Sequence, residues 1–224
     1  MPSPPPLRKR HAYPVALLCA ALLLGACHGS SGKHTATPGS TAVPSTDARG
    51  KPRVSLSLTV GKLQVQGAGP AKPFDANVAK AVRGWTNKYI GAAMAGPLFT
   101  GSASVGLVRY FSPQIFRRIG LKAHDRAALT DEGTPVMTIV TKVGKAPLDL
   151  VALEDHGRTV MVGAKVHVSV SGDTAKGPLT VDRIGNFVFE SKGRNIWYIS
   201  GYTLIVTRTI GGSSTTSKAT TTTS

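Results

Sequence analysis

The second half of this chain, residues 136–209, is a succession of β-type segments, and this pattern constrains the fold more than any other sequence feature. Five runs are rich in β-branched and aromatic residues: VMTIVTKV, LDLVAL, TVMVGAKVHVSVS, LTVDRIGNFVFE and IWYISGYTLIVTRT. The segments between them are composed of turn-forming residues: GKAP, EDHG, SGDTAKGP and SKGRN. Because short turns join strands that lie side by side, the pattern predicts an antiparallel meander.

Residues 75–96, ahead of the meander, have the period of an amphipathic helix. Apolar or small residues recur at spacings of three and four: Val78, Val82, Trp85, Tyr89, Ala92 and Gly96. Asp75 is a suitable N-cap, and Gly96-Pro97 is a suitable stop. The spacing therefore predicts one long helix with an apolar face.

Shorter helices are predicted between this helix and the meander. The segment SASVGLVRYF is interpreted as helical, with Val108 directed inward. Ser112-Pro113 has the form of a helix start and leads into QIFRRI, which ends at Gly120, and residues 125–129 add a further turn. Helices followed by an antiparallel meander indicate an α+β fold, with the helices packed on one face of a curved sheet.

A short β-hairpin is predicted ahead of the helices. VSLSLTV, residues 54–60, alternates between apolar and polar positions, as a half-buried strand does. Gly61-Lys62 fits a two-residue turn with glycine first, and LQVQ then fits a returning strand.

The first 26 residues have the layout of a secretory signal peptide. A basic cluster, residues 8–10, precedes the apolar segment AYPVALLCAALLLGA, and small residues stand just before Cys27. The apolar segment is shorter than the roughly 20 residues that span a bilayer, so export is favoured over a permanent transmembrane helix.

Leu24-Gly25-Ala26-Cys27 resembles the lipobox of bacterial lipoproteins. The resemblance implies cleavage before Cys27, a diacylglycerol on its thiol and a further acyl group, such as palmitate, on its new amino group. Cell-membrane anchoring at the extracytoplasmic face follows, because two or more acyl chains bind membranes firmly. Ordinary cleavage that leaves a free thiol is the alternative. Cys19 leaves with the signal, so an acylated mature chain has no free thiol and no disulfide.

The remaining residues divide into three parts. Residues 27–52 are rich in Ser, Thr, Gly and Pro and are predicted to form a flexible tether behind the lipid. Residues 53–209 are predicted to form a single α+β domain. Residues 210–224, which include GGSSTTSKATTTTS, are predicted to be a disordered Ser/Thr-rich tail by their composition.

The domain also resembles a known group of proteins. The GPLF-type helix stop, the segment DRAALTDEGTP and the final run IWYISGYTLIVTR resemble those of uncharacterised actinobacterial secreted proteins and lipoproteins. That resemblance, over residues 54–208, implies a nuclear-transport-factor-two-like fold, a cone of helices against a curled sheet. The predicted hairpin ahead of the helices is not part of the minimal pattern of that fold. The fold hosts enzymes, ligand binders and assembly modules, so it implies no catalytic residue.

The charge of the chain bears on its partners. Three of the 27 basic residues leave with the signal peptide, so 24 basic and 11 acidic residues remain, a net charge of +13. These basic residues are scattered over strands and loops and form no basic helix or aromatic-interleaved stripe, which argues against nucleic acid as a partner. For an exported protein, anionic lipids and wall polymers are the expected anionic partners.

Residues with the spacing of a catalytic or metal site are sparse. The sequence has no HExxH motif and no histidine pair at helical spacing in the domain, so no metal or cofactor is predicted. It has no GxSxG motif either. Asp131 and Glu132 are adjacent carboxylates, which we interpret as the end of a helix before the turn at Gly133 and not as an acid–base pair.

One candidate pocket can be assembled from the pattern. Lys165 and His167 share one face of a strand, where they could bind an anion or act as a base. Trp85, Tyr89 and Tyr202 could add an aromatic wall. In the alternative interpretation, that strand face is solvated or His167 hydrogen-bonds a neighbouring strand, and the aromatic residues belong to the core.

These observations together predict a non-enzymatic, envelope-anchored lipoprotein that binds a ligand or another envelope protein. Two alternatives remain open at this point. The first is an enzyme that uses the cavity of the cone, with His167 as acid or base. The second is a structural protein that docks its basic surface onto wall polymers.

Overall fold

The computed structural model describes residues 45–46, 52–53, 56–67, 72–102, 106–119, 123–193 and 196–221, all within the compact unit Pro38–Thr222. The predicted signal peptide and the lipid attachment at Cys27 lie outside the described residues. The predicted tether is described only at its C-terminal end, where β1 (Ser45–Thr46) pairs antiparallel with β2 (Pro52–Arg53).

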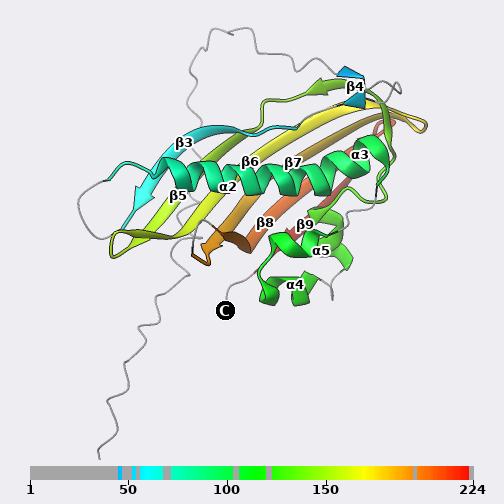
Figure 1. The fold of residues 1–224 in the computed structure, drawn as a ribbon. Helices are drawn as coiled ribbons and strands as arrows, with labels where there is room; N and C mark the ends of the chain where they lie inside the picture. The colour runs from blue at the N-terminus through cyan, green and yellow to red at the C-terminus, as the bar shows by residue number, and fades with distance from the viewer. Residues whose placement is uncertain are drawn as a thin grey trace, which may run out of the picture. The chain divides into compact units, whose positions relative to one another are not determined.

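The domain is of the α+β class, with a mostly antiparallel, open sheet of seven strands (Figure 1). The strands are β3 (Thr59–Gln66), β4 (Met137–Val143), β5 (Pro147–Asp155), β6 (Arg158–Thr174), β7 (Gly177–Ser191), β8 (Trp197–Ile210) and β9 (Ser213–Thr220). Their order is β3-β5-β6-β7-β8-β9, with β4 paired to β6. Strands β4 to β8 confirm the five strands predicted from the β-branched and aromatic runs.

Strand β6 is long enough to pair with two strands along one edge. Its N-terminal part pairs with β5, as at Val166↔Leu148, and its C-terminal part pairs with β4, as at Val170↔Val143. Gly144 lies between the two partners, and its backbone N donates to the carbonyl of Ser169 at 2.8 Å. β4 and β5 thus follow one another along the same edge of β6.

The predicted leading hairpin is wrong, because β3 runs straight through Gly61 and Lys62 and pairs in parallel with β5. The register shifts between Val60 and Leu63, and the backbone N of Lys62 donates to Asp149 Oδ1 at 2.8 Å. A Cβ at Gly61 would collide with that same carboxylate oxygen. Glycine is therefore needed here for close approach within a bulged strand, and not for a reversal of the chain.

The long helix begins as predicted and extends further than predicted. It comprises α2 (Ala76–Ile90), the π-helical turn η2 (Gly91–Ala95) and α3 (Gly96–Thr100). The Asp75 side chain accepts from the backbone N of Asn77 at 2.7 Å, which confirms the N-cap. The predicted stop at Gly96-Pro97 is wrong, because the π turn puts Pro97 in the first turn of α3, where its missing N–H is tolerated. Gly101, with φ +66°, ends the helix.

Three short helices follow: η3, a 3-10 helix (Leu107–Tyr110), α4 (Pro113–Ile119) and α5 (Ala123–Leu129). The predicted helix over SASVGLVRYF is reduced to η3 in the described part, and Val108 is exposed and not inward. Ser112 begins α4 as predicted, since its Oγ accepts from the backbone N of Ile115 at 3.4 Å. Within the described ranges, no helix combines the length and the apolar character needed to span a bilayer.

The buried core cluster contains side chains of the helical segments and of the sheet. Figure 1 shows α2 running across the strands. The Tyr89 ring of α2 contacts Phe187 of β7 edge to face, with ring centroids 5.2 Å apart. Val162, Val181 and Val206, from β6, β7 and β8, belong to the same buried cluster.

The predicted disorder of the C-terminal tail is wrong for Ser213–Thr220, which form β9 and pair with residues 203–210 of β8. Gly211 and Gly212 both have positive φ, 54° and 90°, so they form the tight turn that returns the chain. Threonine is β-branched and favours strands, and Ala219 is buried. A segment of low sequence complexity therefore forms the second strand of a hairpin whose turn is Gly211-Gly212.

Candidate functional site

Lys165 and His167 lie on the face of the sheet opposite the core. Val166 and Val168 alternate with them in β6 and are buried, whereas both polar residues are exposed. His167 is in register with Ile184 of β7, which pairs with Ile205 of β8 and then Lys218 of β9. We call this cross-strand row, together with Lys165 and Asp182, the outer face.

His167 is engaged by a carboxylate on the neighbouring strand. Its Nε2 lies 2.8 Å from Asp182 Oδ1, and the two side chains are 48% and 37% exposed. This is the interpretation in which His167 hydrogen-bonds a neighbouring strand on a solvated face. The contact orients the imidazole along the sheet surface.

The three aromatic residues of the candidate pocket lie on the other side of the sheet. Tyr89 and Tyr202 are buried, and Trp85 is half-buried. Phe111 lies between the two tyrosines, with ring centroids 5.7 Å from Tyr89 and 6.1 Å from Tyr202. Trp85 packs edge to face on Tyr110 at 5.8 Å. The structure therefore does not bring the five candidate residues together: two are on the outer face and three in the core.

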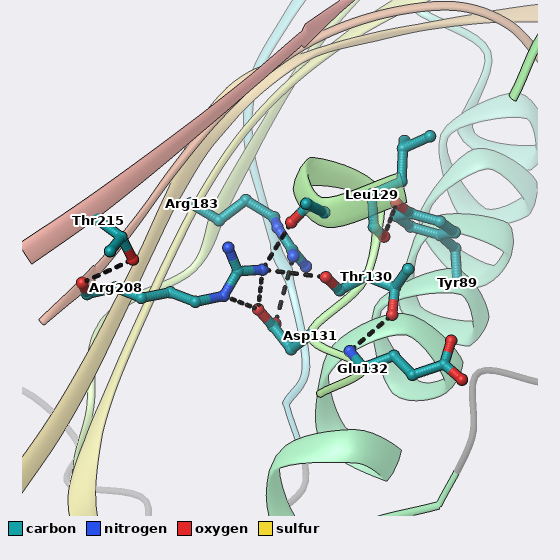
Figure 2. A network of polar contacts seen from close by, with 9 residues as sticks. Tyr89, Leu129, Thr130, Asp131, Glu132, Arg183, Arg208 and Thr215 are labelled. Atoms are coloured by element: carbon teal, nitrogen blue, oxygen red, sulfur yellow. Dashed lines mark hydrogen bonds and ion pairs between the residues drawn. The ribbon is translucent and has the colours of Figure 1, made fainter. Parts of the chain in front are cut away.

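The most concentrated polar chemistry of the described residues surrounds Asp131, two residues after the end of α5 (Figure 2). This carboxylate is fully buried. Its Oδ1 accepts from Arg208 Nε at 2.9 Å and Nη2 at 2.6 Å, and its Oδ2 accepts from Arg183 Nη2 at 3.2 Å. We call these three residues the arginine cluster.

The backbone of Asp131 is also fixed in place. Its N–H donates to the carbonyl of Ala93 at 2.8 Å. Pro97 has no amide hydrogen to donate to that carbonyl, which lies four residues earlier in the helix. Asp131 O accepts from the backbone N of Thr134 at 3.0 Å, which closes the turn after α5. The Ala93 carbonyl of the π-helical turn thus helps to position the buried carboxylate.

Arg208 links the sheet to the end of helix α5. Besides Asp131, its Nη2 donates to the carbonyl of Ala127 at 2.8 Å and to that of Thr130 at 2.9 Å. Carbonyls at a helix C-terminus carry partial negative charge and lack helical partners. A guanidinium from β8 therefore caps α5 and neutralises Asp131 at the same time.

Tyr89 lies beside the arginine cluster. Its hydroxyl donates to the carbonyl of Leu129, the last residue of α5, at 2.6 Å. Burial raises the pKa of the Tyr89 hydroxyl above its ordinary value near 10, and the charge of Arg183 partly opposes that shift. Tyr89 is therefore a neutral donor at physiological pH, and the bond to Leu129 is structural.

Asp131 and Glu132, which the sequence predicts to end a helix, lie in different environments. Glu132 is exposed, pairs with Arg126 at 3.2 Å and donates its backbone N to Thr130 Oγ1 at 2.8 Å. Of the two, only Asp131 contacts side chains of the sheet, those of Arg183 and Arg208. The prediction that the pair ends a helix before a turn is confirmed, since α5 ends at Leu129.

The alternation of side chains along β7 and β8 contains a signal for the arginine cluster. Arg183 alternates with Val181 and Phe187 on the core face of β7, and Arg208 follows Val206 in the same parity of β8. An arginine at a core position needs a buried acid, because a buried charge without a partner is costly. The apolar residues of a strand predict which face is buried, but they do not reveal the two arginines that share this face.

The arrangement is suited to holding segments together. Asp131 is saturated by two arginines, and no group of three or more potential metal ligands occurs in the described part of the chain. Comparison of the chain with protein-family models, with curated proteins and with solved structures finds no match.

Proposed function

We propose that this chain is a non-enzymatic binding module, held at the extracytoplasmic face of a bacterial membrane by a lipid on Cys27, which binds another envelope protein through its outer face. The anchor part of the proposal is supported by the order of sequence features: a basic cluster, an apolar segment and Leu24-Gly25-Ala26-Cys27. Acylation would also explain why the only cysteine after the predicted cleavage site stands at the start of a tether.

The proposed protein-binding surface is supported mainly by two exposed isoleucines, Ile184 and Ile205. They are directly opposite one another in β7 and β8, and each is 42% exposed. His167 and Lys218 flank them in the same row. An apolar centre with a polar rim is the anatomy of a protein-binding patch. The aromatic side chains proposed for an internal pocket are instead packed against two other aromatic residues, Tyr110 and Phe111.

We also infer the cone-like, nuclear-transport-factor-two-like arrangement for the domain. The support is that helix α2 precedes the meander and that Tyr89 contacts Phe187 of the sheet. The parallel pairing of β3 with β5 is an addition to the antiparallel meander. An experimental structure of the mature chain would test the curvature of the sheet directly.

The anchor is tested by intact-mass spectrometry of the protein from the membrane fraction of its native host. We expect the mass of a chain that starts at Cys27 and carries acyl groups, and a Cys27→Ala variant that is lost from that fraction. An unmodified Cys27 in the mature protein would overturn the anchor. That result would leave the proposed binding surface to be tested separately.

The binding surface is tested with a photoreactive residue at position 205, in membranes of the native host. Val108 is the matched control, because it is 48% exposed against 42% for Ile205 but belongs to η3 and not to the outer face. We expect a discrete cross-linked envelope protein from position 205 and none from position 108, and loss of that product in an Ile184→Glu variant. Equal labelling from both positions would refute the surface.

A second candidate function, docking on anionic wall polymers, is favoured by one observation. Lys165 and Lys218 are exposed on the outer face, while the nearby carboxylate of Asp182 is engaged by His167. In that case, binding to isolated cell wall would weaken with salt and with Lys165→Gln and Lys218→Gln together, and a neutral Ile184→Gln variant would still bind.

A further inference from the structure

Arg183 is the least satisfied member of the arginine cluster. It is 1% exposed, and of its three nitrogens only Nη2 has a hydrogen-bond partner, Asp131 Oδ2 at 3.2 Å. Its Nε and Nη1 are buried and have no hydrogen-bond partner among the described residues. Buried donors of this kind are rare in folded proteins and call for an acceptor.

The charges of the cluster do not balance. Two guanidinium groups share one carboxylate, and Arg208 makes the shorter contacts with it, 2.6 and 2.9 Å against 3.2 Å for Arg183. Arg208 also has two carbonyl acceptors at the end of α5. One positive charge, at Arg183, therefore has no matching negative charge within the cluster.

The other nearby polar groups do not supply that charge. The Tyr89 hydroxyl is neutral and donates to Leu129. Asp125, the second buried carboxylate of the described residues, accepts from the Tyr202 hydroxyl at 3.2 Å and forms no ion pair with Arg183 or Arg208. Burial of an unmatched charge is costly, so a bound counter-charge at Arg183 is strongly favoured.

We propose that Arg183 binds one small monovalent anion of the chloride class in the interior of the domain. One charge is required because one is unmatched, and an acceptor is required because Nε–H and Nη1–H only donate. Small size follows from burial between the helical segments and the sheet. A water molecule would satisfy the N–H groups but not the charge.

The anion would complete the junction at which Arg183 of β7, Arg208 of β8 and the end of α5 meet. Because the anion binds the folded chain and not the unfolded one, its concentration raises the melting temperature. The proposal is independent of the outer face and of the lipid anchor. It makes the stability of the domain depend on the kind of anion, and not only on ionic strength.

The test is thermal unfolding of the full chain in potassium chloride and in potassium gluconate at equal ionic strength. We expect the melting temperature to rise saturably with chloride, by about 3–6 °C at a concentration ten times the dissociation constant. Arg183→Met should lose this dependence. Arg126→Met is the control and should keep it, because Arg126 is exposed and pairs with Glu132. Equal curves in the two salts, or chloride dependence that persists in Arg183→Met, would overturn the proposal.

Crystals of the wild-type chain grown in bromide provide a readout that needs no variant. We expect an anomalous peak within hydrogen-bond distance of Arg183 Nη1 or Nε. A difference map that shows only water, or nothing, beside this guanidinium would also refute the site, even if Arg183→Met fails to fold.

Discussion

The molecule contains two kinds of side-chain contact to a carboxylate, one inside and one outside. His167 and Asp182 meet at 2.8 Å on the outer face, where both are more than a third exposed. Arg208 and Asp131 meet at 2.6 Å in the core, where Asp131 has no exposed surface. The distances are alike, but solvent screens the first pair and not the second. The contact distance alone therefore does not predict which pair contributes more to stability, whereas burial does.

The largest effect is expected from the inner contact. Asp131→Asn keeps the shape of the side chain and removes its charge, which leaves two buried guanidinium groups without a carboxylate partner. We expect the free energy of unfolding to fall by about 3–5 kcal/mol, measured by urea denaturation. Glu132→Gln, one residue away and exposed, is the matched control and should change it by less than about 1 kcal/mol. Similar losses for the two variants would contradict the comparison.

An intermediate effect is expected at Tyr89, which lies beside the arginine cluster. Tyr89→Phe removes the hydroxyl that donates to Leu129 O and leaves a buried carbonyl unsatisfied. We expect a loss of about 1–3 kcal/mol in the free energy of unfolding at neutral pH, with the aromatic packing retained.

This effect of Tyr89 also has a defined pH dependence. Because the folded state raises the pKa of the hydroxyl above its ordinary value near 10, the folded chain keeps a proton that the unfolded chain releases. The stability contributed by the hydroxyl is fully present below pH 10 and is lost as the pH rises above it. The difference in unfolding free energy between wild type and Tyr89→Phe should shrink above pH 10, and a constant difference would show that the hydroxyl is not shielded.

The smallest effect is expected from the outer contact. A double-mutant cycle of His167→Gln and Asp182→Asn should give a coupling energy of at most about 1 kcal/mol, which falls as salt is added. A coupling above 2 kcal/mol that is insensitive to salt would mean that the outer pair is as well shielded as the inner one.

Strands β4 to β8 were predictable because each is a β-branched run bounded by turn residues, and the cap at Asp75 is a local signal. The hairpin at Gly61 was mispredicted because the same glycine serves a turn or a bulge, and only Asp149, far along the chain, decides between them. The helix stop at Pro97 was mispredicted because a π turn can absorb a proline. The first error arises where a distant contact overrides a local preference, and the second where an irregular turn of the helix does so.

The candidate site was predictable only in part, and for a related reason. The alternation in β6 correctly separated His167 from Val166 and Val168, but it could not say which face meets the helices. The arginine cluster needs Asp131, Arg183 and Arg208, which are separated by 52 and 77 positions along the chain. Such a grouping follows from the register of β7 and β8 and the end of α5, and no local pattern contains it.

The pairing of β9 has a consequence for the order in which the sheet is assembled. Strand β9 follows every other described strand in the chain, and the backbone N of Thr221 donates to Tyr202 O at 2.9 Å just beyond it. Until residues 213–221 have been synthesised, β8 is an open edge that carries Leu204, Val206 and an unpaired backbone ladder. A nascent or truncated chain that stops at Ile210 therefore exposes a long, apolar strand edge, which is the geometry that templates intermolecular β-pairing. Pairing of the threonine-rich strand β9 therefore closes this edge of β8 once synthesis is complete.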